Sequence, residues 1–278
     1  KRLVQAPAFV DKVVQHALVD NLLYDRVTRS FIKDNYASQN GKGTHYGLDW
    51  LRRFLINYWN KNRTADGWIL KCDVRKFFAN IDHDRLKAVL LKLDFEPKIY
   101  AMLCGYIDTS EGLPLGYQTS QLFALLFLDR FDHFVKEVLR IRYYGRYMDD
   151  FFLICPDREY LRFCLREINA FMAVIGLELN EKTHIFPLKN GINFLDFHTY
   201  LTDTGKVIRK LRRSSVKKMR AKLRYWEKAY PAGEVERKEI LDSWQAWNAH
   251  AAHGNTWQLR REVWQRVQDI LKEEIKWQ

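Results

Sequence analysis

The feature that most restricts the fold of this chain is a pair of adjacent aspartates inside a β-prone stretch. The tetrapeptide Tyr147-Met148-Asp149-Asp150 has aromatic and aliphatic residues on both sides. This pattern predicts two strands, over residues 142–149 and 150–155, joined by a tight acidic turn. Adjacent carboxylates repel each other and destabilise such a turn unless cations neutralise them. An ordinary aspartate-rich surface turn is the alternative interpretation of these residues alone.

A second carboxylate ends another apolar segment. Residues 67–74 (Gly-Trp-Ile-Leu-Lys-Cys-Asp-Val) predict a strand, and Asp73 lies at its end. Alone, Asp73 would be read as a helix cap or a surface charge. Together with Asp149 and Asp150 it supplies the oxygen ligands that two Mg²⁺ ions, about 3.5–4 Å apart, need for nucleotidyl transfer. We therefore predict that these three aspartates are catalytic and bind two Mg²⁺ ions, for which Mn²⁺ can substitute.

The rest of the pattern predicts an α+β body followed by a helical region. We expect helices over 8–33, 46–60, 97–106, 120–139 and 159–175, and one that is capped by Asp82 or Asp84 and runs to Leu93. We also expect a loop over 39–44, a turn over 111–116, a strand near 178–186 and a hairpin over 192–207. Nine of the sixteen residues from Arg209 to Arg224 are basic, and six of the nine tryptophans follow Arg224. We therefore place a domain boundary near residue 210.

Composition points to a polyanionic partner. Lys and Arg outnumber Asp and Glu by 46 to 34, which gives a formal charge of +12. Such a balance favours nucleic acid, although a solvated basic surface or contact with anionic membrane would give the same totals. The four cysteines form no CxxC pair, which argues against a zinc ribbon and for reduced thiols in a cytoplasmic protein. No signal peptide and no membrane-spanning run of about 20 apolar residues is present, so we expect no membrane association.

The motifs make the chain similar to reverse transcriptases. Residues 73–78 (Asp-Val-Arg-Lys-Phe-Phe) resemble the first catalytic motif of that family, and residues 147–150 resemble the second. Residues 112–116, 176–183 and 193–197 resemble the motif beneath the nascent base pair, the motif whose lysine approaches the nucleotide phosphates, and the primer-grip hairpin. The resemblance implies a right-hand polymerase fold. Fingers and palm, an antiparallel sheet plus helices, would span 1–209, and a helical thumb would span 210–278.

The resemblance also implies roles for individual residues. Asp73, Asp149 and Asp150 would hold the metals with the Val74 carbonyl, and Phe78 would be the steric gate that rejects a ribose 2′-hydroxyl. The predicted nucleotide-binding residues are Lys76, Phe77, Phe78, Leu115, Gly116 and Lys182, with Lys1 or Arg2 as a fingers cation. The predicted template–primer residues are Tyr147, Met148, Gln118, Ser120, Gln121, Phe194, Leu195, Lys217, Arg220 and Arg224. The partners would be template RNA, a DNA primer and deoxynucleotides.

One segment indicates which group of reverse transcriptases the chain resembles. Residues 113–121 read Leu-Pro-Leu-Gly-Tyr-Gln-Thr-Ser-Gln, which is similar to the reverse transcriptases of diversity-generating retroelements, except at Tyr117. Residues 6–16, residues 36–45 and the segment from Trp244 to Asn255 also look like that group. The resemblance implies an error-prone enzyme that copies a template RNA with the help of a basic accessory protein. The alternatives are a group II intron-like, retron-like or phage-defence reverse transcriptase, and an inactive RNA-binding relative.

Leu115 carries its own physical prediction. Group II intron and retroviral enzymes usually have glutamine there, which can hydrogen-bond the incoming nucleotide, whereas leucine offers only an apolar contact. Without that hydrogen bond, the enzyme loses part of its discrimination against a wrong nucleotide. We therefore expect errors, mainly opposite template adenines.

The basic and aromatic residues near the C-terminus have more than one interpretation. The run from Arg209 to Arg224 is either a solvated helix or the surface that follows the template–primer backbone, and its position after the predicted palm favours the second. The tryptophans beyond Arg224 form either a helical core or platforms on which bases stack, and their helical spacing favours the core. His250 and His253 have no predicted partner for a metal, so we expect them to be structural or to lie near the nucleic acid.

Overall fold

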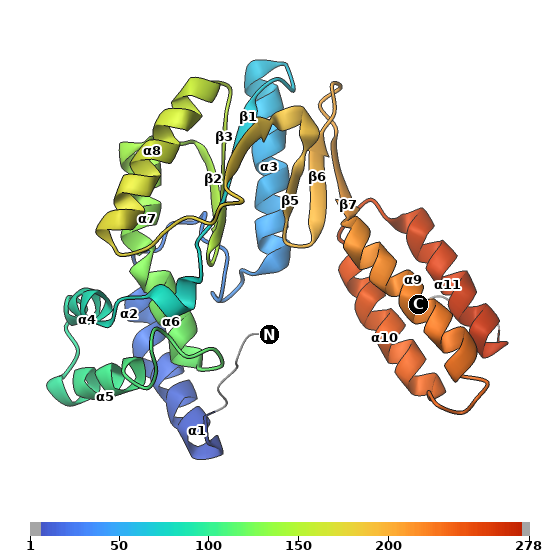
Figure 1. The fold of residues 1–278 in the computed structure, drawn as a ribbon, viewed down its shortest axis with the longest axis horizontal. Coiled ribbons are helices and arrows are strands. Elements are labelled where there is room, and N and C mark those ends of the chain that lie inside the picture. The colour runs from blue at the N-terminus through green and yellow to red at the C-terminus, as the bar shows by residue number, and fades with distance from the viewer. Residues whose placement is uncertain (1–6, 274–278) are drawn as a thin grey trace. The chain divides into compact units, whose positions relative to one another are not determined.

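The computed structural model describes residues 7–273 of the chain (Figure 1). The chain divides into two compact units, of which the first comprises residues 1–51 and 66–187 and the second comprises residues 52–65 and 188–278. Helix α3 (Thr44–Asn62) contributes residues to both units. The boundary near residue 210, drawn from composition, stays a prediction. Within residues 7–273, no helix combines the length and the apolar character needed to cross a membrane.

The first unit is built on a four-stranded antiparallel sheet in the order β2-β3-β1-β4. Its strands are β1 (Trp68–Asp73), β2 (Tyr143–Tyr147), β3 (Asp150–Cys155) and β4 (His184–Pro187). The predicted acidic hairpin is confirmed, because Tyr147 pairs with Asp150 and leaves Met148 and Asp149 as the two turn residues. Met148 has a φ of 56°, the left-handed conformation that two-residue hairpin turns require. The predicted strand 178–186 is shorter, since only Leu179 pairs, as an isolated bridge, before β4 begins.

The first unit also contains several helices. They are α1 (Phe9–Leu18), α2 (Tyr24–Thr28), α4 (His83–Leu91), α5 (Pro97–Ile107), α6 (Gln118–Phe127), α7 (Asp129–His133) and α8 (Arg158–Val174). The π-helical turns η1 (Val19–Leu23) and η3 (Phe134–Val138) and the 3₁₀ turn η2 (Phe77–Asn80) complete them. Asp82 caps α4 as expected, accepting a hydrogen bond from the Arg85 amide at 2.8 Å. Buried residues of α8 recur every three to four positions, at Leu161, Cys164, Ile168 and Met172, and this face packs on β1 and β3.

Two long predicted helices are interrupted. The helix expected over 8–33 contains a π-turn and ends at Thr28, because the chain then bends so that Asn35 can pair with Arg146 of β2. The helix expected over 120–139 breaks at Leu128, whose ψ of 4° is not helical, and then continues as α7 and η3. Apolar periodicity continues across both breaks, so the sequence pattern does not reveal them.

The second unit combines a sheet with three helices. Its antiparallel sheet has the order β5-β6-β7, formed by β5 (Ile192–Phe194), β6 (Phe197–Leu201) and β7 (Val207–Leu211), where the sequence predicted only a hairpin. Helices α9 (Arg213–Ala229), α10 (Arg237–Ala251) and α11 (Trp257–Leu271) follow. The asparagine Asn255 docks on β7, since its amide donates to the Arg209 carbonyl at 2.7 Å and its side chain accepts from the Arg209 amide at 2.9 Å.

The tryptophans of the second unit mostly form its core, as predicted. Trp226, Trp244 and Trp264 are buried, and the rings of the last two lie 4.0 Å apart between centroids. The prediction is wrong for Trp257, which is 62% exposed at the first turn of α11 and lies beneath the Arg261 guanidinium. Trp277 lies outside the described residues. His250 is structural, as expected, because its ring packs against Phe197 at 4.9 Å.

Candidate active site

Backbone pairing brings the three predicted catalytic aspartates together at one end of the first unit's sheet. Asp73, the last residue of β1, lies directly opposite Asp150, the first residue of β3. The Val74 amide donates to the Asp149 carbonyl at 3.1 Å, which holds the acidic turn beside the end of β1. On the other side, the Asn180 amide donates to the Asp73 carbonyl at 2.7 Å. Residues far apart in sequence are thus fixed next to each other by main-chain bonds.

Asp73 and Asp149 line one cavity of about 450 Å³. It also contains most of the residues predicted to bind the nucleotide. The full lining is Asp73, Val74, Arg75, Lys76, Phe77, Phe78, Ala79, Leu115, Asp149 and Asn180. Both carboxylates are half-buried, so they remain open to a ligand that enters the cavity. Phe77 is buried and meets the half-buried Phe78 ring edge-on, with centroids 5.7 Å apart.

Asp150 is placed differently from the other two. Its carboxylate forms an ion pair with Lys71, which lies on the same face of β1 as Asp73. Like charges directly opposite each other in a sheet destabilise it, and the Lys71 ammonium offsets the repulsion between Asp73 and Asp150. Asp150 is absent from the residues that line the cavity. Its predicted role as a metal ligand stays a prediction.

The turn over residues 111–116 brings Leu115 to the cavity by docking on η2. The Leu113 amide donates to the Phe78 carbonyl at 2.7 Å. Gly112 makes this approach possible, because a Cβ atom there would lie 2.3 Å from the Phe78 carbonyl oxygen, and its φ of 64° suits glycine. The sequence pattern located this turn but held no sign of its contact with Phe78.

The lining of the cavity fits divalent magnesium. Asp73 and Asp149 offer carboxylate oxygens, which are hard ligands of the kind that Mg²⁺ prefers, and Val74, whose carbonyl stays a predicted ligand, lines the same cavity. Neither cysteine nor histidine is among the described residues that line it. Across residues 7–273, no three acidic, histidine or cysteine side chains close around one point. The two carboxylates of the cavity suit Mg²⁺, which usually binds through one or two carboxylates and keeps water or substrate phosphates as further ligands.

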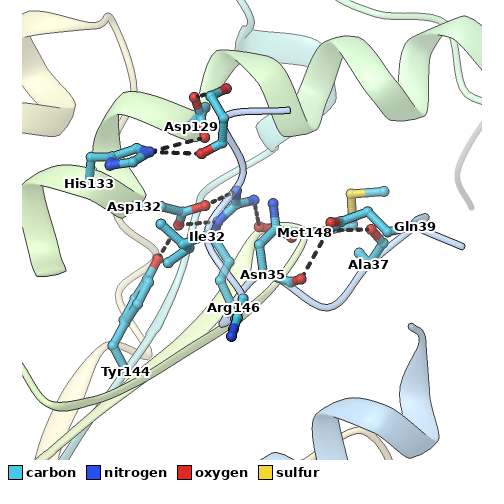
Figure 2. A network of polar contacts seen from close by, with 12 residues as sticks. Ile32, Asn35, Ala37, Gln39, Asp129, Asp132, His133, Tyr144, Arg146 and Met148 are labelled. Carbon is cyan, nitrogen blue, oxygen red and sulfur yellow. Dashed lines mark hydrogen bonds and ion pairs between the residues drawn. The ribbon is translucent and has the colours of Figure 1, made fainter. Parts of the chain in front are cut away.

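A buried ion pair supports the acidic turn (Figure 2). The Arg146 guanidinium of β2 contacts both carboxylate oxygens of Asp132 on α7, at 2.7 Å from Nε and 2.5 Å from Nη2, and both side chains are fully buried. The Tyr144 hydroxyl donates to the same carboxylate at 2.5 Å. The remaining guanidinium nitrogen, Nη1, donates to the Met148 carbonyl at 2.9 Å. Arg146 therefore connects α7 to the residue that precedes Asp149.

The main chain of Arg146 is held as well. Its amide donates to the Asp34 carbonyl and its carbonyl accepts from the Tyr36 amide, both at 2.9 Å. Burial alone would lower the pKa of Arg146, but the Asp132 carboxylate outweighs burial and raises it above the ordinary value. Burial, and then Asp132, raise the pKa of Tyr144 well above its ordinary value. The guanidinium therefore stays charged and the phenol stays protonated, so both keep their donor roles.

The other predicted residues lie at several places in the two units. Gly116 precedes α6, Gln118, Ser120 and Gln121 belong to its first turns, and Ser120 is buried. Tyr147 ends β2, and Met148 is buried against Ala37 and Leu125. Lys182 is exposed and is not among the cavity residues. In the second unit, Phe194 is buried, Leu195 is at the β5–β6 turn, and Lys217, Arg220 and Arg224 share one exposed side of α9. Lys1 and Arg2 lie outside the described residues.

Sequence reasoning missed several residues at this site. Arg75 and Asn180 line the cavity, and Asp132 and Arg146 support the turn, yet none was singled out. Asn180 lies inside the motif over residues 176–183, so that segment was a usable signal. Arg146 sits one residue before the tetrapeptide, but a charged residue in a strand is ordinarily expected at the surface. Its burial could not be anticipated without knowing that Asp132 faces it.

The sheet with its acidic turn, the helices of the first unit and the helices of the second unit form the fingers, palm and thumb fold of polymerases. The chain belongs to the reverse transcriptase (RNA-dependent DNA polymerase) family, whose family model matches residues 1–199. The family predicted from the motifs and the α+β right-hand fold are therefore confirmed. A comparison with curated proteins found no match.

Solved structures of telomerases resemble this chain. Telomerase from Candida albicans, in complex with a TWJ fragment of telomeric RNA, has a TM-score of 0.55 and 13% sequence identity, over 96% of this chain and 48% of that chain. Telomerase from Candida tropicalis, in a similar complex, has a TM-score of 0.49 and 14% identity, over 95% and 44% of the two chains. The chain spans about half the length of these telomerases. At such low identity the likeness to the Candida albicans telomerase establishes the fold alone.

Proposed function

We propose that this chain is an RNA-directed DNA polymerase whose reaction takes place in the cavity between Asp73 and Asp149. The observation that carries the proposal is the presence, in one cavity, of two half-buried carboxylates and the Phe78 and Leu115 side chains. Membership of the reverse transcriptase family supports it. Template RNA, a DNA primer and deoxynucleotides would be its substrates, and the +12 charge suits such polyanions.

The residues that line the cavity would have different roles in the reaction. Asp73, Asp149 and the Val74 carbonyl would hold two Mg²⁺ ions, which when bound activate the primer 3′-hydroxyl and stabilise the leaving pyrophosphate. Lys76, and Arg75 with its ion-pair partner Glu178 at 3.4 Å, would lie near the triphosphate, where their positive charge favours binding. Phe78 would lie against the sugar and Leu115 beside the base pair. Asp150, paired with Lys71, would contribute negative charge close to the ions.

Primer extension tests this proposal. The purified chain is given a DNA primer on an RNA template, Mg²⁺ and deoxynucleotides, and the products are sequenced. We expect the primer to grow by the complement of the template and to stop growing when a chelator removes the metal. Extension without regard to template sequence, or no extension with Mg²⁺ or Mn²⁺ and a candidate accessory protein, would contradict the proposal.

Substituting Phe78 should relax sugar selection. The Phe78 ring lines the cavity beside Asp73 and Leu115, where it can block a 2′-hydroxyl. We expect Phe78→Ala to reduce the preference for deoxynucleotides over ribonucleotides by about 100-fold, because removing a steric contact in a pocket has effects of this size. Single-nucleotide incorporation measures both substrates, and Phe78→Tyr, which keeps the ring, should remain selective. If Phe78→Ala prefers deoxynucleotides as strongly as the natural protein does, Phe78 is not the steric gate.

We further propose that the enzyme belongs to the diversity-generating type and copies its template with errors. Support comes from the segment over residues 113–121 and from Leu115, whose apolar side chain faces the cavity where a glutamine could hydrogen-bond the nucleotide. A basic accessory protein would then assist it. A template repeat and a matching variable repeat next to the gene would support this type, and their absence would favour the group II intron-like, retron-like or phage-defence alternatives.

Leu115→Gln should make synthesis more accurate. A glutamine amide restores a polar contact that a mispaired nucleotide satisfies poorly, so we expect misincorporation opposite template adenines to fall about tenfold. Sequencing of cDNA made on one RNA template by the two proteins measures this rate. Leu115→Met keeps the apolar contact and should stay error-prone. If Leu115→Gln and the natural protein misincorporate equally, the assignment of Leu115 is wrong.

A further inference from the structure

The second unit contains a strongly basic hollow on the exposed face of its sheet. The cavity measures about 940 Å³ and is lined by residues of η4 (Leu188–Asn190), all three strands of the sheet and the start of α9. Four of its lining residues are cations: Lys189, Lys210, Arg212 and Arg213. None of the described lining residues is acidic. A concave surface with this charge attracts an anion, and its volume exceeds that of a simple phosphate.

The sheet sets the order of the polar groups on its floor. Asn193 of β5, His198 of β6 and Lys210 of β7 are successive cross-strand partners, so they form one row on the same face. The His198 Nδ1 atom lies 3.0 Å from the Asn193 Oδ1 atom, which fixes the plane of the imidazole. Burial, followed by Lys210, Arg212 and Arg213, lowers the pKa of His198. The imidazole is therefore largely neutral near pH 7 and presents a flat ring among cations.

A second aromatic ring lies beside the first. The Tyr200 ring centroid is 5.9 Å from that of His198, and the Lys210 ammonium lies 5.6 Å from the Tyr200 centroid. Gly191, just before β5, lets both side chains approach its backbone, since a Cβ atom there would lie 2.8 Å from the His198 Nε2 atom and 2.7 Å from the Tyr200 Cβ atom. Aromatic rings can stack on bases, and the neighbouring cations can bind phosphates. The hollow therefore matches a ligand that has both bases and phosphates.

We propose that this hollow binds an unpaired segment of nucleic acid, with a base against the His198–Tyr200 pair and phosphates on Lys210 and Arg212. A single strand can place a base inside a concave site, whereas the bases of a duplex are stacked and unavailable. The positive end of α9, a 17-residue helix with no acidic residue in its first turn, adds to the attraction for phosphate. The proposal concerns binding and does not depend on the polymerase reaction proposed above.

Fluorescence anisotropy tests the proposal on the full chain without divalent metal, so that no synthesis can occur. The probes are labelled 12-nucleotide RNA and DNA strands and a blunt duplex of the same sequence. We expect His198→Ala/Tyr200→Ala to weaken single-strand binding at least about tenfold, within the range known for base–aromatic stacking. Lys210→Ala/Arg212→Ala should also weaken it and reduce the slope of log K against log salt by about 1.4, since two phosphate contacts are lost.

The control is Lys228→Ala/Lys238→Ala, which removes the same charge from exposed positions of the second unit outside the hollow. If it weakens binding as much as Lys210→Ala/Arg212→Ala, only net charge matters and the site is refuted. Equal losses for duplex and single strand would refute the preference for unpaired nucleic acid. Photo-crosslinking of a 4-thiouridine strand to the unmodified protein needs no variant to fold. Crosslinks should fall on the peptide that contains His198 and Tyr200, and crosslinks found only elsewhere would overturn the proposal.

Discussion

Asp149→Asn should abolish primer extension and leave the fold intact. Asparagine has nearly the same shape and keeps one oxygen, but it loses the negative charge that would hold the metal ions. We expect the rate of nucleotide incorporation to fall by about a thousandfold or more, which corresponds to about 4 kcal/mol in the barrier. Asp73→Asn should behave in the same way, because both carboxylates line the cavity. Single-turnover incorporation on an RNA template measures the loss.

The matched control is Asp242→Asn, which neutralises an exposed aspartate on α10. It should extend primers at the rate of the natural protein. Thermal unfolding of all three variants should stay close to that of the natural protein, since neither Asp73 nor Asp149 is deeply buried. If Asp149→Asn retained more than about a tenth of the natural rate, the cavity would not be the site of the reaction.

Arg146→Met should strongly destabilise the first unit. The substitution leaves the Asp132 carboxylate buried without its cation, and breaking a buried pair in this way costs about 3–5 kcal/mol. The Met148 carbonyl would also lose its donor. Chemical denaturation should show a lower midpoint, and extension should fall as well. These two losses have separate causes, which a second variant can distinguish.

That second variant is Asp132→Leu/Tyr144→Phe/Arg146→Met, which replaces the whole polar group by apolar side chains. Exchanging a buried ion pair for well-packed apolar residues is often neutral, so most of the lost stability should return. Extension should stay at least about tenfold below the natural rate, because the residue before Asp149 is no longer held and small misplacements of catalytic groups are costly. Natural extension by this stable variant would mean that Arg146 supports the fold without positioning the turn.

The sequence predicted the acidic hairpin because β-prone residues flank a turn that can only be tight. It also placed Asp73 at a strand end. Because three carboxylates can bind the same pair of metal ions, the sequence predicted that Asp73 lies close to Asp149 and Asp150. The helix breaks at Leu128 and in η1 could not be predicted in the same way, since the apolar periodicity does not change there. The helix expected over 8–33 also ends before its predicted end, at Thr28, and the chain beyond it forms a tertiary bridge between Asn35 and Arg146.

The supporting parts of the site escaped prediction for a related reason. Gly112 reads as an ordinary turn glycine, and only the structure reveals that its missing side chain lets Leu113 reach the Phe78 carbonyl. Likewise, the burial of Arg146 depends on Asp132, fourteen residues earlier on a different element. The motifs therefore identify residues that line the cavity. The contacts that hold these residues in place involve residues distant in sequence, which the local pattern does not reveal.

We propose that the metal ions of the reaction bind between Asp73 and Asp149, and iron-directed cleavage tests this most directly. Replacing Mg²⁺ by Fe²⁺ and adding ascorbate and peroxide generates hydroxyl radicals at the bound metal, and mass spectrometry locates the main-chain breaks. The account predicts breaks near residues 73–79 and 147–150, and their loss in the Asp73→Asn/Asp149→Asn double variant. Breaks that occur elsewhere, or that persist at the same sites in that variant, would contradict it.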